Sequence, residues 1–97
     1  ASPGRFVGRA RVITSIEEFG KLQLGEVLVA AATNPAWTPL FPLASAVVTE
    51  VGGGATHCSL VAREHGIPCV MGRNVATSVI HDGQIITVDG TEGIVYL

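Results

Sequence analysis

Residues 51–64 read "VGGGATHCSLVARE", and this stretch decides how the rest of the sequence is interpreted. Three consecutive glycines lead through Ala55 and Thr56 to His57, where a helical spacing of apolar residues begins. The preceding segment, 44–50, is apolar and β-branched, which is typical of a buried strand. The stretch is therefore predicted to form a strand, a glycine-rich loop and a helix that starts near His57. Gly66, with Pro68 two positions on, is expected to end this helix as its C′ residue.

Strand patterns recur on both sides of this unit. Alternating or continuous apolar residues predict further strands over 5–13, 26–31 and 67–72. Near the carboxyl end, the Asp82-Gly83 and Asp89-Gly90 pairs predict turns of a β-hairpin. Because strands alternate with short helical segments, the sequence predicts one α/β domain over residues 1–97, with a mixed sheet and short helices.

The first two helices have their own boundary signals. Thr14 with Glu17, or Ser15 with Glu18, fits a capping box for a short helix that ends near Gly20. In the second connection, Asn34 is suited to the N-cap position, Pro35 to the first helical position, and Pro39 to keeping the helix short. One more helical turn is expected over 74–80.

The composition argues against several classes of protein. The 97 residues are 47% hydrophobic and 14% charged, which argues against disorder. The net charge of −2 and the 5% aromatic content provide no footprint for nucleic acid, and no apolar run is long enough to span a membrane. Cys58 and Cys69 form no CxxC pair, so a reducing, cytoplasmic location is expected. The chain begins at Ala1, which suggests a piece of a longer protein.

The glycine–histidine junction is suited to phosphate. The first backbone N–H groups of a helix have no partner within the helix, and the positive end of the helix dipole favours anions. The Lys-Ser/Thr pair of a Walker A loop is missing, and His57 occupies the anion site instead. A helix N-terminus disfavours the charged imidazole and favours the nucleophilic neutral form. His57 is therefore a candidate for accepting and donating a phosphoryl group.

Other interpretations remain open from the residues alone. The glycines could form only a tight turn, and His57 could be structural. A thiol nucleophile at Cys58 is disfavoured, because adjacent helical residues point about 100° apart. Zinc binding by His57, Cys58, His65 and Cys69 lacks the usual paired spacing, so no metal is expected. Trp37 is expected in the core, with the rim of the site as the alternative.

Residues 49–72, "TEVGGGATHCSLVAREHGIPCVMG", resemble the phosphohistidine signature of the phosphoenolpyruvate-utilising enzymes. These enzymes include pyruvate phosphate dikinase, phosphoenolpyruvate synthase, enzyme I of the sugar phosphotransferase system and rifampin phosphotransferase. The similarity extends over nearly the whole chain, with Cys58 and Gly54 as departures from the usual residues. The positions that match the signature are Thr49, Gly52, Gly53, His57, Ala62, Arg63, Glu64, Gly66, Ile67, Pro68, Val70 and Gly72.

The resemblance implies a swivelling β/β/α phosphohistidine domain that carries a phosphoryl group on His57, usually on Nε2. The donor and acceptor sites would lie on partner domains. These are an ATP-grasp nucleotide-binding domain and a barrel for phosphoenolpyruvate (PEP) and pyruvate, or an antibiotic-binding domain. Mg²⁺ and ATP or PEP would bind there, and no cofactor would bind to this domain. The chain would be a phosphotransferase component and not a complete enzyme.

The resemblance also assigns roles to individual residues. Gly52, Gly53 and Gly54 would shape the loop and offer N–H groups to phosphate oxygens. Thr56 would cap the helix or bind the ring or phosphate. The remaining positions are Thr38, which would orient the imidazole, Thr49, which would support the loop, and Arg63.

Arg63 follows His57 by six residues, about 120° around an ideal helix, so structural pairing or docking is as plausible for it as phosphate contact. Two rivals to the carrier hypothesis are a non-catalytic docking module that retains the fold and a Cys/His hydrolase.

Overall fold

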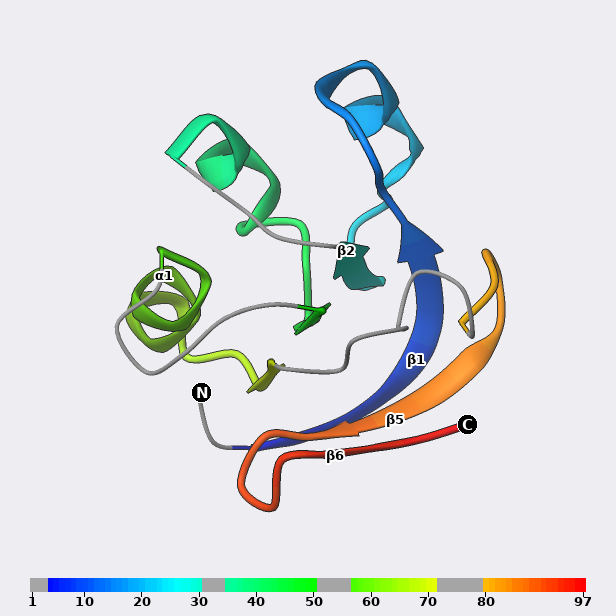
Figure 1. The fold of residues 1–97 in the computed structure, drawn as a ribbon, viewed down its shortest axis with the longest axis vertical. Coiled ribbons are helices and arrows are strands. Elements are labelled where there is room, and N and C mark those ends of the chain that lie inside the picture. The colour runs from blue at the N-terminus through cyan, green and yellow to red at the C-terminus, as the bar shows by residue number, and fades with distance from the viewer. Residues whose placement is uncertain (1–3, 31–34, 51–56, 72–79) are drawn as a thin grey trace.

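The computed structural model describes residues 4–30, 35–50, 57–71 and 80–97. Strands are found within each segment predicted to contain one, and short helices lie between them (Figure 1). The helical turn expected over 74–80 lies, apart from Ile80, outside the described residues. In chain order the elements are β1 (Arg5–Val12), η1 (Ile16–Lys21), β2 (Val27–Ala30), η2 (Pro35–Leu40), β3 (Ala46–Thr49), α1 (His57–His65), β4 (Cys69–Val70), β5 (Ile85–Asp89) and β6 (Ile94–Tyr96).

The strands form one mixed sheet in the order β4-β3-β2-β1-β5-β6. Strands β1 to β4 are parallel, whereas β5 and β6 are antiparallel to their neighbours. Strand β1 belongs to both halves: Ala10 lies opposite Val27 of parallel β2, and Gly8 lies opposite Ile86 of antiparallel β5. The expected mixed sheet with short helices is confirmed.

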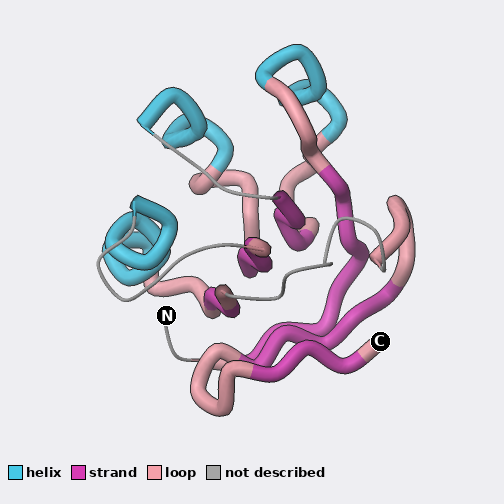
Figure 2. The backbone as a smooth tube through the Cα atoms, in the orientation of Figure 1, coloured by secondary structure: helices cyan, strands magenta, loops and turns pink. Residues whose placement is uncertain are grey.

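Two hydrophobic layers lie on opposite faces of the short parallel strands. Along β2, Leu28 belongs to the layer under the helices, whereas Val27 and Val29 belong to the layer that contains Ile86 of β5. Figure 2 shows the helices on one side of β2, β3 and β4, with β1, β5 and β6 curving around the other side. Both faces of the parallel strands are therefore covered, which explains why their sequences are almost continuously apolar.

The first two helices are short 3₁₀ segments. Pro39 lies inside η2 and has no backbone N–H to donate, consistent with the irregular helix expected there. The N-cap Asn34 predicted for η2 lies outside the described residues. At η1 the predicted capping box is wrong, because the N-cap Ser15 makes no side-chain cap bond. The Glu18 carboxylate instead accepts bonds from the hydroxyl of Thr14 and, at 2.8 Å, from its backbone N–H.

Helix α1 ends as its sequence predicts. Gly66 adopts a φ of +68°, which glycine tolerates without steric cost. Its N–H bonds the carbonyl of Arg63 at 3.2 Å, and the N–H of Ile67 bonds the carbonyl of Ala62 at 3.1 Å. These two bonds form a Schellman motif, which satisfies the last helical carbonyls. Ala62 is fully buried and anchors the helix on the sheet.

Acid should weaken the contact between η1 and the turn before β5. Lys21 Nζ lies 3.3 Å from Glu18 Oε2 and 3.1 Å from Asp82 Oδ2. The Thr14 hydrogen bonds, followed by Lys21, lower the pKa of Glu18 from 4.5 to about 2. Because the folded state holds the ionised form, this stabilisation is complete above pH 4.5 and is lost as the pH falls toward about 2.

Glu18→Gln is therefore expected to flatten the dependence of the free energy of unfolding on pH below 4.5. Urea unfolding followed between pH 2 and pH 6 measures this dependence. Glu17→Gln is the matched control, because the Glu17 carboxylate lies on the same helix and makes no hydrogen bond or ion pair with the described residues. A Glu18→Gln profile that is as steep as the wild-type profile would contradict the assignment.

Candidate functional site

The predicted site gathers at the edge of the sheet where the parallel strands end. Thr49 is the last residue of β3 and lies opposite Ala30, the last residue of β2. Helix η2 follows β2, and α1 connects the carboxyl end of β3 with the amino end of β4, so His57 begins α1 at this edge (Figure 1). Ligands of open α/β sheets bind at this kind of edge.

His57 is the first residue of α1, as the sequence predicts. At this position its backbone lies among the helical N–H groups that have no partner within the helix. The structure describes the backbone of His57 but not its side chain. Gly52, Gly53, Gly54 and Thr56 lie outside the described residues, so their roles remain predictions.

The three other predicted site residues differ in their placement. Thr49 is completely buried at the end of β3, where it can support the following loop. Thr38 is exposed on η2, and its carbonyl accepts the N–H of Phe41 at 3.1 Å. Arg63 is exposed in the last turn of α1. Six residues of helix rise about 9 Å, so Arg63 is separated from His57 along the helix as well as around it.

Aromatic contacts hold the helices that flank this edge. Phe19 of η1 and Trp37 of η2 meet edge to face, with ring centroids 5.1 Å apart and planes at 66°. Phe41, which follows η2, stacks on His65 of α1 at 6.2 Å. Trp37 is buried, which confirms the expected core position. The Phe41–His65 contact was not predicted, because nothing in the local sequence links the two residues.

The described part of the chain offers few groups that could bind a metal ion. Within residues 4–30, 35–50, 57–71 and 80–97, no three His, Cys, Asp or Glu residues are grouped so that they could hold a metal ion. Cys69 is buried and forms no disulfide with the described residues, and the side chain of Cys58 is not among the parts that the structure describes. In the same segments, no helix is long and apolar enough to cross a membrane.

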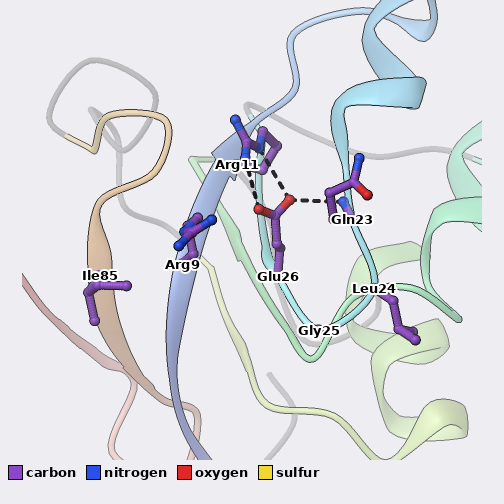
Figure 3. Close-up of a pocket in the computed structure, with 7 residues that line it drawn as sticks. All are labelled: Arg9, Arg11, Gln23, Leu24, Gly25, Glu26 and Ile85. Atoms are coloured by element: carbon purple, nitrogen blue, oxygen red, sulfur yellow. Dashed lines mark hydrogen bonds and ion pairs between the residues drawn. The ribbon is translucent and has the colours of Figure 1, made fainter.

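A second surface feature, which the sequence analysis missed, is a pocket of about 410 Å³ beside β1 and the start of β2 (Figure 3). Arg11 donates to the Glu26 carboxylate from Nε at 3.2 Å and from Nη2 at 2.8 Å. These bonds from Arg11 are the main cause that lowers the pKa of Glu26. The residues that line the pocket are Arg9, Arg11, Gln23, Leu24, Gly25, Glu26 and Ile85.

Comparison with known families gives one extended match. The family described as "PEP-utilising enzyme, mobile domain" matches residues 22–93. This range contains the glycine loop, all of α1 and β2 to β5. It therefore covers every residue predicted for the site around His57, but not Arg9 and Arg11 of the pocket.

Individual relatives agree with this match. The chain is 52% identical over 92 residues to rifampicin phosphotransferase of Bacillus cereus, covering 95% of this chain and 10% of the relative. It is 47% identical over 97 residues to phosphoenolpyruvate synthase of Aeropyrum pernix, covering 99% of this chain and 12% of the relative. The chain thus spans about a tenth of the length of each of these relatives.

A solved structure has a similar fold. The NMR solution structure of an Enzyme I (nEIt) protein matches with a TM-score of 0.69 and 33% sequence identity. The match covers 79% of this chain and 32% of that chain. Both the relatives and this structure are therefore considerably longer than the chain.

Proposed function

The chain belongs to the PEP-utilising enzyme mobile-domain family, and from this we propose that it is a phosphoryl carrier in which His57 is transiently phosphorylated. The observation that carries the proposal is the position of His57 at the first residue of α1, at the carboxyl edge of the parallel strands. A phosphoryl group on this residue would meet helical N–H groups that lack partners and the positive end of the helix dipole.

The chemistry needs only a neutral imidazole and an in-line donor. The lone pair of a ring nitrogen of His57, Nε2 in our proposal, attacks the phosphorus. The bond from phosphorus to the donor's leaving oxygen breaks, and that oxygen keeps the electron pair. The reverse step passes the phosphoryl group to an acceptor and restores neutral His57.

The supporting residues act on this reaction in different ways. We assign backbone N–H donation to phosphate oxygens to Gly52, Gly53 and Gly54, and capping or hydrogen bonding to Thr56. Thr38, exposed on η2, orients the imidazole. Two further residues act more indirectly: buried Thr49 supports the loop, and exposed Arg63 contributes to docking instead of contacting phosphate.

The donor and acceptor belong to partner domains in this proposal. Because the chain covers about a tenth of the two relatives, most of each relative lies outside the region of similarity. We propose an ATP-grasp domain as one partner and a PEP/pyruvate barrel or antibiotic-binding domain as the other, which together hold the Mg²⁺ and ATP or PEP. The domain would swivel between them in the cytoplasm. A phosphoenolpyruvate synthase and a rifampicin phosphotransferase among the relatives fit one carrier that serves different acceptors.

Phosphoramidate, a small phosphoryl donor, tests the carrier chemistry without any partner domain. The wild-type chain is expected to gain one phosphoryl group by mass spectrometry and a phosphoimidazole resonance in its ³¹P NMR spectrum, both of which disappear in acid. A chain unfolded in urea is the control for unspecific reaction of exposed imidazoles. If the folded chain reacts no faster than the unfolded chain, the domain is a docking module that retains the fold, and the carrier proposal fails.

A further inference from the structure

The outer face of β1 combines positive charge with exposed apolar side chains. Along the strand, Arg5, Val7 and Arg9 are exposed, whereas Phe6, Gly8 and Ala10 point to the core side. Three of the chain's six Lys and Arg residues lie on β1, although the chain carries a net charge of −2. Arg11, on the same face of β1, lies opposite Leu28 of the layer under the helices, so this face is continuous with the helix-bearing side of the sheet.

Apolar side chains on neighbouring elements extend the same face. Ile85 of β5 lies directly opposite Arg9 and is 56% exposed. On the other side of β1, Leu24 in the turn before β2 is 78% exposed, and both residues line the pocket of Figure 3. An exposed arginine beside large exposed apolar side chains is a combination that contact surfaces contain, because arginine is enriched there.

Two of the charged side chains that line the pocket pair with each other, whereas the third does not take part in that pair. The Glu26 carboxylate accepts bonds from Arg11 and, at 2.8 Å, from the backbone N–H of Gln23. Arg11 and Glu26 therefore neutralise each other. The guanidinium of Arg9 makes no ion pair or hydrogen bond within the described segments of the chain, although its charge contributes to lowering the pKa of Glu26. The pocket thus presents one exposed guanidinium beside the exposed side chain of Ile85, with exposed Leu24 on the turn at its far rim (Figure 3).

We propose that this pocket docks an extended acidic segment of a partner domain. A carboxylate of the segment binds Arg9, and apolar side chains on the same side of the segment cover Ile85 and Leu24. A carboxylate is favoured over other polar groups because guanidinium matches it in charge and in the spacing of its donors. Gly25, which also lines the pocket, leaves room for the backbone of the segment.

The pocket lies at the opposite edge of the parallel strands from the candidate phosphorylation site. Glu26 immediately precedes β2, and Ala10 pairs with Val27 at the start of that strand, so Arg9 lies near the amino ends of the parallel strands. Thr49 and His57 lie at the carboxyl ends, which four residues of strand place about 10 Å further on. A partner held at the pocket would therefore leave the edge with His57 open. The docking itself does not depend on the chemistry of His57.

A peptide titration tests the proposal. The probe is the N-acetylated, C-amidated peptide Val-Ser-Glu-Ser-Leu, in which Val, Glu and Leu point to one side when the peptide is extended. Backbone amide resonances of the ¹⁵N-labelled chain are expected to shift at Arg9, Leu24 and Ile85. Arg9→Gln is expected to weaken binding and raise the Kd roughly threefold to fivefold, which corresponds to the loss of an exposed ion pair. The peptide with Gln in place of Glu should show the same loss.

Arg5→Gln is the matched control, because Arg5 is exposed on the same face of the same strand but does not line the pocket. It should leave the Kd unchanged. The proposal is overturned if no resonance shifts at about 10 mM peptide, or if the shifts lie on another face. It also fails if Arg5→Gln weakens binding as much as Arg9→Gln. Concentration-dependent shifts of the same residues without peptide would instead identify a second copy of the chain as the occupant.

Discussion

A His57→Ala variant is expected to lose phosphorylation by phosphoramidate, with an initial rate roughly 100-fold below that of the wild type. The reason is electrostatic as well as chemical. In the carrier hypothesis, the N–H groups at the start of α1 that have no partner within the helix, and the positive end of the helix dipole, would stabilise the phosphoryl oxygens as charge develops. An imidazole elsewhere on the chain reacts without that stabilisation. Mass spectrometry of samples quenched at short times measures the rate.

The chain contains its own controls for this experiment. His65 is exposed at the carboxyl end of the same helix, where the dipole disfavours a phosphate, and His81 is exposed before the turn that leads to β5. His65→Ala and His81→Ala are therefore expected to react at the wild-type rate. A His57→Ala variant that reacts normally, or a His65→Ala variant that does not react, would contradict the carrier hypothesis.

Replacing Phe41 by alanine is expected to lower the free energy of unfolding by about 3–4 kcal/mol. Phe41 is 1% exposed within the core layer under the helices, and its ring stacks on His65. Removing the ring leaves a cavity between η2, α1 and the sheet. Because stabilities of domains of this size are about 5–15 kcal/mol, a large part of the total would be lost. Urea unfolding followed by the fluorescence of Trp37, the one tryptophan of the chain, measures the change.

Two further variants test whether the loss of stability comes from the cavity or would follow any substitution in the domain. Phe41→Leu retains most of the buried volume and should cost about 1.5 kcal/mol or less. Leu24→Ala removes a side chain that is 78% exposed, so its cost should stay within about 0.5 kcal/mol. Equal costs for Phe41→Ala and Leu24→Ala would mean that the helices do not pack on the sheet as described.

The sequence predicts those elements whose formation depends on residues close together in the chain. The buried strands β2 and β3 were predicted because both of their faces are covered, which requires continuous apolar residues. The end of α1 was predicted because only Gly66 easily adopts the positive φ of its terminal motif. The capping box at η1 failed because Glu18 bonds Thr14, one residue before the N-cap position.

Features that depend on distant parts of the chain could not be predicted in this way. The order of the strands depends on β1 pairing with both β2 and β5, which no local pattern specifies. Likewise, Arg9 and Arg11 look like ordinary outward-facing residues of a strand. Only the register that brings Arg11 to Glu26 reveals the pocket. The roles of Gly52, Gly53, Gly54 and Thr56 were read from the resemblance and remain predictions.

The double pairing of β1 has a consequence for how the domain acquires its structure. Arg5 lies opposite Asp89, so the first strand is completed by a strand from near the other end of the chain. During synthesis on the ribosome, β2, β3 and α1 would emerge long before the layer formed by Val88 and Ile86 can close over them. Folding of this segment should therefore be slow, since it waits for contacts between residues far apart in sequence.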